Sequence, residues 1–234
     1  MVSRWRLVVT VLSLTLAACG GGGGGGSSDE DAVGPGPATG KAADTARART
    51  IVLEQADMPA GWRGAAHTET TQERERARDI SICLGRPDPE TFQITRVYGP
   101  DLTMGSMQVS SIATVLNTVE DAKADLAAVR GPKYGQCLIP AFRDDLRRQA
   151  SDARVENVAS EPLQVESFGD GSVGIRLTAE LVYPDRTERL FADLVYITKD
   201  RSTVSATFFS FNQPFPAALE QSLISRMGNR IATA

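Results

Sequence analysis

The chain has 234 residues, a formal net charge of −4, 41% hydrophobic residues and 23% charged residues. This mild acidity, without a basic patch that carries interleaved aromatic residues, argues against binding to nucleic acid. Beyond the first residues, no stretch approaches the roughly eighteen apolar residues that a membrane-spanning helix requires.

The first residues have the pattern of a secretory signal peptide. Arg4 and Arg6 supply positive charge, and the apolar run Leu7–Leu16 that follows is too short to span a membrane. The quartet "LAAC", which ends at Cys19, resembles a bacterial lipobox. That resemblance implies that residues 1–18 are a lipoprotein signal peptide and that Cys19 is lipidated. The alternative is an ordinary secreted protein with a free cysteine near its start.

A glycine-rich stretch follows Cys19. Gly20–Gly26 and the segment "SSDEDAVGPGPATG" cannot bury apolar area, so we expect a disordered tether over residues 19–41. Two acyl chains on Cys19 would give stable anchoring to a lipid bilayer. The expected location of the remaining domain, residues 42–234, is therefore the extracytoplasmic face of the cell membrane.

Two further cysteines remain once Cys19 is assigned to lipid. In an oxidising compartment an isolated pair such as Cys83 and Cys137 is typical of a disulfide. A metal pair or a catalytic thiol is the alternative, but a metal site would need more ligands close in sequence, and the sole histidine, His67, is distant. The sequence therefore predicts one disulfide and no metal site.

Helical spacing of apolar residues and helix-end signals predict five helices. They are expected over Lys41–Ala56, from Thr71 as cap through Cys83, from Thr118 as N-cap to Gly131, over Gly135–Gln149, and from Pro216 onward. The segment "DMPAGW" ends the first helix through Pro59 and Gly61.

Alternation of apolar and polar residues predicts five strands. One is expected between the second and third helices, over residues 105–118, and four follow one another over residues 155–165, 172–183, 189–199 and 203–212. The connections between the last four are short, which favours antiparallel pairing. The predicted class is α+β, with an antiparallel sheet whose C-terminal meander is flanked by helices.

Four features of the sequence occur together: the opening "VLEQADMPAGW", a cysteine after the second helix, another after a later helix, and a meander closed by a helix. This combination resembles exported actinobacterial lipoproteins and the extracellular sensor domain of PknH-like serine/threonine kinases. The resemblance spans about residues 42–234. It implies an antiparallel sheet flanked by helices, as in the Mog1/PsbP fold, and a groove for an unidentified ligand. It carries over no catalytic residue and no kinase domain.

Motifs that carry chemistry are weak in this sequence. "GDGSVG" matches the dinucleotide fingerprint, but a strand follows it where that fingerprint requires a helix. His67 lies in the polar segment "GAAHTETT", which favours a solvated loop residue over a general base. Trp62 follows a rigid turn and is the candidate ligand-binding residue, with core packing as the alternative.

We therefore expect a non-catalytic, sensor-like domain that binds an unidentified small molecule or envelope protein, with no cofactor, no metal and no nucleic acid. The alternative is a cell-envelope enzyme whose site is assembled from scattered residues. The patterning places the apolar residues of the meander under the last helix, so any groove should open on the other sheet face or near "DMPAGW".

Overall fold

The computed structural model describes residues 40–234. The predicted signal peptide, Cys19 and nearly all of the predicted tether lie outside the described residues. None of the helices between residues 40 and 234 is long and apolar enough to cross a membrane.

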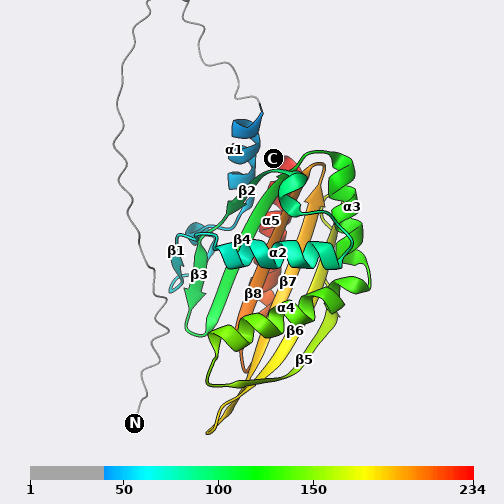
Figure 1. The fold of residues 1–234 in the computed structure, drawn as a ribbon. Helices are drawn as coiled ribbons and strands as arrows, with labels where there is room; N and C mark the ends of the chain where they lie inside the picture. The colour runs from blue at the N-terminus through cyan, green and yellow to red at the C-terminus, as the bar shows by residue number, and fades with distance from the viewer. Residues whose placement is uncertain (1–39) are drawn as a thin grey trace, which may run out of the picture. The chain divides into compact units, whose positions relative to one another are not determined.

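The described part of the chain is an eight-stranded antiparallel sheet flanked by five α-helices, which confirms the predicted α+β class (Figure 1). The helices are α1 (Lys41–Ile51), α2 (Thr71–Cys83), α3 (Val119–Arg130), α4 (Lys133–Gln149) and α5 (Ala217–Thr233), with 3-10 turns η1 (Gln55–Asp57) and η2 (Pro89–Thr91). The strands are β1 (Arg63–Ala65), β2 (Gln93–Tyr98), β3 (Asp101–Met104), β4 (Met107–Leu116), β5 (Arg154–Leu163), β6 (Gly171–Val182), β7 (Thr187–Lys199) and β8 (Ser202–Phe211).

The strand order is β1-β3-β4-β8-β7-β6-β5, and β2 pairs with β4 beside β3. The four C-terminal strands form the predicted antiparallel meander. β4 joins this meander through β8, so a strand from the first half of the chain lies next to the last strand.

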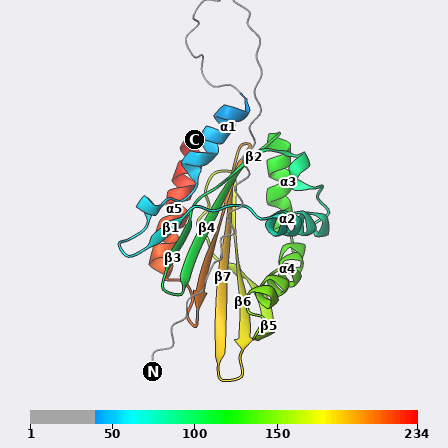
Figure 2. The same cartoon turned by 60° about the vertical axis from the view of Figure 1, so that its left-hand side comes forward.

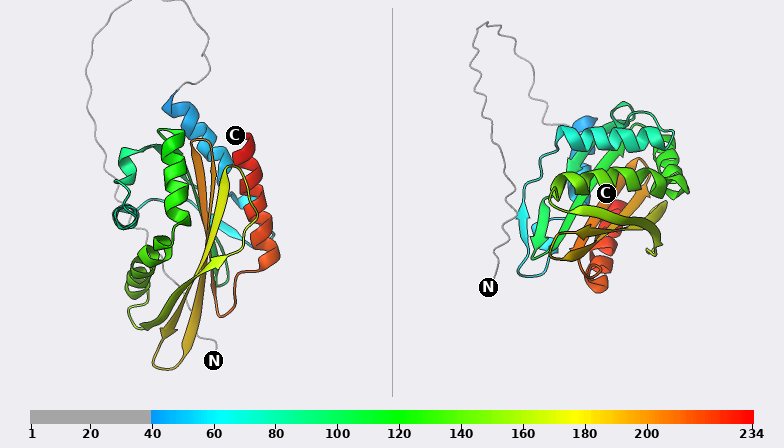
Figure 3. Two further views of the ribbon diagram at one scale, coloured as in Figure 1. Left: turned by 90° about the vertical axis from the view of Figure 1, so that its right-hand side faces the viewer. Right: turned by 60° about the horizontal axis from the view of Figure 1, so that its bottom comes forward.

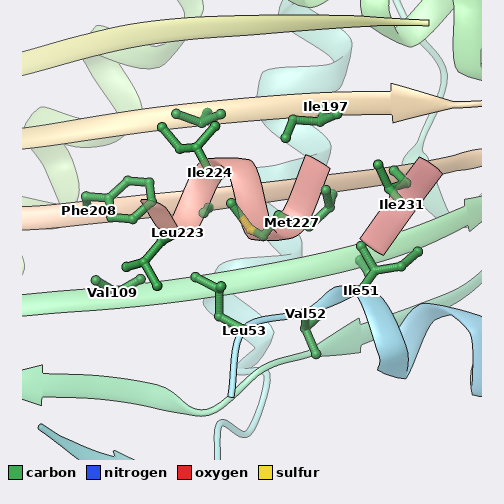
Figure 4. Close-up of a cluster of buried hydrophobic side chains, with 14 of the residues drawn as sticks. Ile51, Val52, Leu53, Val109, Ile197, Phe208, Leu223, Ile224, Met227 and Ile231 are labelled. Carbon is green, nitrogen blue, oxygen red and sulfur yellow. The ribbon is translucent and has the colours of Figure 1, made fainter. Parts of the chain in front are cut away.

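One face of the sheet, which we call the α5 face, is covered by α1 and α5 (Figure 2). Its apolar side chains are nearly all inaccessible to solvent, with Phe208, Val109 and Ile197 at 0% exposure. Figure 4 shows them packed against one side of α5. Leu223, Met227 and Ile231 of α5 are fully buried here, while Leu219 is partly buried.

The opposite face, which we call the α3 face, is covered by α2, α3 and α4 (Figures 2 and 3). Here Leu138, Phe142 and Leu146 of α4 pack on Leu177 and Ala179 of β6, together with neighbouring residues of β5 and β7. The apolar side chains of β6 therefore face α4. The meander thus has apolar residues on both sides, and the expectation that they lie under the last helix holds only for one side.

Three strands and several helix ends differ from the prediction; α4, for example, begins at Lys133 instead of Gly135. β1, β2 and β3 were not predicted, because β1 has three residues and Gly99-Pro100 separates β2 from β3. α1 ends at Ile51, and residues 55–57 form η1 because the Asp57 carboxylate accepts from the backbone N–H of Glu54. The N-cap of α2 is Thr70, which forms a capping box with Glu73, so the prediction of Thr71 was one residue late.

Candidate binding groove

The two sheet faces differ in the solvent exposure of the side chains of their central strands. On the α5 face, Val204 and Ala206 of β8 are 0% and 2% exposed. On the α3 face, the intervening Ser205 and Thr207 are half-buried, as is Tyr196 of β7. Because β7 and β8 lie inside the sheet, this partial exposure shows that the helices on the α3 face leave space above them.

A cavity of about 80 Å³ occupies part of that space. It lies between α3, α4 and the sheet, and we call it the α3-face cavity. Hydroxyl and aliphatic groups line it together, and the residues whose side chains face it include Val129, Tyr134, Leu194, Tyr196, Ser205 and Thr207. On β4, Ser110 and Thr114 are also half-buried and share this face through their pairing with Thr207 and Thr203.

A buried polar group lies beside the cavity. The Tyr196 hydroxyl donates to the Asp125 carboxylate of α3. Burial and the nearby Asp125 raise the pKa of Tyr196. Burial also raises the pKa of Asp125, because it outweighs the Tyr196 hydrogen bond and the charge of Arg86, which lower that pKa. The Arg86 Nε lies 4.0 Å from Asp125. The charges next to the cavity are thus matched within the protein.

A second polar cluster lies where the segment between β1 and α2 meets the edge of the sheet. The His67 ring stacks on Tyr98 with a centroid distance of 4.4 Å, and its Nδ1 lies 3.1 Å from an Asp101 oxygen. Glu69 accepts from Arg96 at 2.8 Å and from the Tyr98 hydroxyl. Burial and the Glu69 hydrogen bond raise the pKa of Tyr98 to about 12, so its hydroxyl stays protonated at neutral pH.

The expectation that His67 is a solvated loop residue was wrong, because its side chain is only 13% exposed. Its neighbours come from β2 and β3, which the sequence did not predict. Both ring nitrogens face carboxylates, Asp101 at Nδ1 and Glu73 at 3.5 Å from Nε2. In this arrangement neither nitrogen is directed at a hydroxyl or thiol nucleophile among the described residues.

Trp62 lies in the hydrophobic core of the α5 face. It is 4% exposed, and its ring centroid lies 6.0 Å from that of Phe215. This placement favours the core-packing alternative, and ligand binding by Trp62 stays a prediction. The indole Nε1 has no hydrogen-bond partner within residues 40–234.

Cys83 and Cys137 form a disulfide that joins the end of α2 to α4. Residues 40–234 hold no group of three or more histidine, cysteine, aspartate or glutamate side chains arranged to bind a metal ion. The segment "GDGSVG" leads directly into β6, as expected for a strand rather than a dinucleotide-binding helix.

One feature of the sequence corresponds to the α3-face cavity. β8 alternates hydroxyl and apolar side chains through Thr203, Ser205 and Thr207. Such alternation is ordinary for a strand with one wet face. Only the pairing with β4 and β7 shows that this strand is central and that its polar side therefore requires an explanation.

No protein-family model matches the chain, and no curated protein matches it. Among solved structures, the fold is similar to the extracellular domain of PknH from Mycobacterium tuberculosis, with a TM-score of 0.42 and 6% identity over 81% of this chain and 96% of that one. It is also similar to LpqN of Mycobacterium tuberculosis, a protein involved in cell envelope biogenesis, with a TM-score of 0.31 and 10% identity over 78% and 87% of the two chains. The first of these two structures is a domain of the kind that the sequence resembles.

Proposed function

We propose that this protein is a lipid-anchored, extracytoplasmic binding protein without catalytic activity, and that it takes up a small uncharged ligand in the α3-face cavity. The lipobox that ends at Cys19 supports the anchor. The Cys83–Cys137 disulfide supports an oxidising, extracytoplasmic location. Labelling of cells with a fatty-acid analogue should mark the wild type and leave Cys19→Ser unmarked.

The polar side of β8 is the observation that carries the binding proposal. Positions at the centre of a sheet that face a helix layer are normally closed to solvent, as they are on the α5 face. Ser205 and Thr207 instead offer hydroxyl groups beside the aliphatic Val129 and Leu194. Such a mixture of a few polar groups in apolar surroundings is typical of ligand sites.

The charges around the cavity indicate the kind of ligand. Arg96 is paired with Glu69, and Arg86 lies near Asp125, so neither cation is left for an anionic ligand. Drug-sized ligands occupy pockets of roughly 300 Å³ or more, well above this cavity. The ligand is therefore small, or it inserts one end and extends along the half-buried hydroxyls of β4 and β8.

Native mass spectrometry of the protein purified from its own host tests the proposal. We expect a bound small molecule on the wild type and its loss in Ser205→Leu, which fills the cavity. Ser222→Leu is the matched control, because Ser222 is exposed on α5. If both variants retained the bound small molecule equally, this site would be wrong. Co-purification of an envelope protein alone would favour a partner-binding role. Chemical conversion of the bound compound would favour the enzyme alternative.

A further inference from the structure

α2 is held in place with very little hydrophobic packing. Ser81 is its only fully buried residue, and Ile82 is 55% exposed. Its C-terminal end is tied to α4 by the disulfide, and its middle by an ion pair between Arg76 and Asp145. A segment with so few buried apolar contacts opens at low free-energy cost unless other groups hold it.

Ionisable side chains hold the N-terminal end of α2 and the segment before it. The Glu73 carboxylate accepts from the Thr70 backbone N–H at 2.7 Å, which caps the helix, while its other oxygen faces His67. His67 in turn faces Asp101 of β3, and Glu69 binds Arg96 of β2. His67 thus lies between the first turn of α2 and the edge of the sheet.

The protonation of His67 decides how well it can join these two elements. A neutral imidazole carries one N–H, so one of its nitrogens must present a lone pair to a carboxylate, whichever tautomer forms. An imidazolium donates from both nitrogens, to Asp101 and to Glu73, and its charge lies over the Tyr98 ring.

The charged groups around His67 are mostly acidic. Asp101 of β3, Glu73 of α2 and Glu69 of the connecting segment carry three negative charges, against the single positive charge of Arg96 of β2, while Tyr98 stays neutral. Loss of the imidazolium charge therefore leaves two carboxylates beside His67 without a cation of their own. Histidine is the side chain that ordinarily changes charge between about pH 5 and 8.

We propose that His67 is a pH-responsive latch, whose protonated ring fastens the N-terminal end of α2 to β3 and whose deprotonation releases that end while the disulfide retains the other. Since α2 crosses the α3 face (Figure 1), its release would widen access to the half-buried hydroxyls beside the cavity. That consequence for ligand access rests on the proposed function, whereas the latch itself is tested without a ligand.

Hydrogen exchange of the full-length protein, followed by mass spectrometry and corrected for the intrinsic pH dependence of exchange, measures the latch. Amides of residues 67–76 should exchange about tenfold more slowly near pH 5 than near pH 8, the factor expected for one charge-assisted hydrogen bond. Amides of β8 should show no such change. His67 is the only histidine of the chain, so its ring protons give an isolated NMR titration, whose midpoint should coincide with that of the exchange change.

Three variants complete the test. His67→Gln should exchange rapidly at both pH values, and His67→Arg, which keeps the charge, should exchange slowly at both. Glu75→Gln, on the exposed side of α2, should behave like the wild type. The latch is refuted if wild-type exchange does not depend on pH, or if His67→Gln retains the dependence. If Ser205→Leu loses the bound ligand but keeps the pH-dependent exchange, the latch stands independently of the binding site. If the wild type binds a ligand but shows no pH-dependent exchange, the binding site stands without the latch.

Discussion

At the scale of single residues, a buried carboxyl pair on the α5 face is an unusual feature of the core. Asp193 of β7 is 0% exposed and accepts two hydrogen bonds from Arg176, each of 2.6 Å. Glu220 of α5 is 5% exposed, and its Oε1 has no partner among the described residues. Burial, and then the nearby Asp193, raise the pKa of Glu220 to about 7 against the opposing charge of Arg176.

This raised pKa predicts a pH-dependent stability. Unfolded Glu220 ionises near its usual value of about 4.5, whereas the folded group stays protonated up to about pH 7. Stability is therefore lost as pH rises across that interval. Glu220→Gln cannot ionise, so near pH 8 its melting temperature should exceed that of the wild type by a few degrees, roughly what 1 kcal/mol gives in a domain of this size.

Calorimetry near pH 5 and pH 8 measures the effect of Glu220→Gln. Near pH 5 the variant and the wild type should differ little. Glu166→Gln, at an exposed loop position, should follow the wild type at both pH values. A gap between Glu220→Gln and the wild type that is equally large at both pH values would contradict the assignment to Glu220 ionisation.

The amino-acid sequence predicted the role of some of these residues but not of others. The pairing of Cys83 with Cys137 was predicted by counting cysteines, because a chain that is expected to be exported leaves few alternatives. The surroundings of His67 could not be predicted, since they depend on β2 and β3. Trp62 was predicted to bind a ligand because it is large and follows a rigid turn, but a residue of the hydrophobic core can have both features.

At the scale of elements, the disulfide should matter most for α2. Because α2 has so little apolar packing, the double variant Cys83→Ala/Cys137→Ala should release it from α4 and leave the sheet folded. The free energy of unfolding should fall by about 2–4 kcal/mol, the usual cost of losing a disulfide. Urea unfolding measures this loss, and hydrogen exchange locates it.

Reduced wild-type protein provides the control for the double variant. It should show the same loss of protection over residues 71–83 and the same urea midpoint. If the amides of β4 and β8 lost protection to the same extent as those of α2, the sheet would depend on the disulfide, and the interpretation of α2 as a tethered outer helix would be wrong.

Elements with strong local signals were predicted well, and those that depend on distant partners were not. The capping residue Thr118 and the stop at Gly131 gave α3 its observed limits. β2 and β3 are short, and their hydrogen bonds go to β4, so neither shows a clear pattern by itself. For α2, the spacing of Thr70 and Glu73 contained the correct cap, and the run of threonines obscured it.

At the scale of the whole molecule, the two faces of the sheet pack against two different layers of helices. Its α5 face is closed and largely apolar, which gives the fold its main core. Its α3 face carries an apolar cluster under α4, but the hydroxyls of β8 remain half-buried beside it. Stability should therefore depend chiefly on one face and ligand binding on the other. The sequence predicted strands with two distinct sides and placed the last helix over the meander, but it did not predict which helices would cover the other side.

Two adjacent residues of β8 allow a direct test of this division. Phe208 points to the α5 face, is 0% exposed and packs 5.3 Å from Phe215, measured between ring centroids. Thr207 points to the α3 face and lines the cavity. Phe208→Ala should lower the free energy of unfolding by about 3–5 kcal/mol, because it removes a large side chain from a closed core. Thr207→Ala should cost less than about 1 kcal/mol, because its hydroxyl is partly hydrated.

Urea unfolding of both variants measures the stability difference, and native mass spectrometry of the host-purified proteins measures ligand retention. Thr207→Ala should reduce the fraction of protein that carries the bound molecule without changing the fold. Phe208→Ala should retain the molecule in whatever fraction remains folded, because Phe208 does not line the cavity. A large loss of stability in Thr207→Ala would show that the α3 face is as much a part of the core as the α5 face, and the division of roles between the two faces would be wrong.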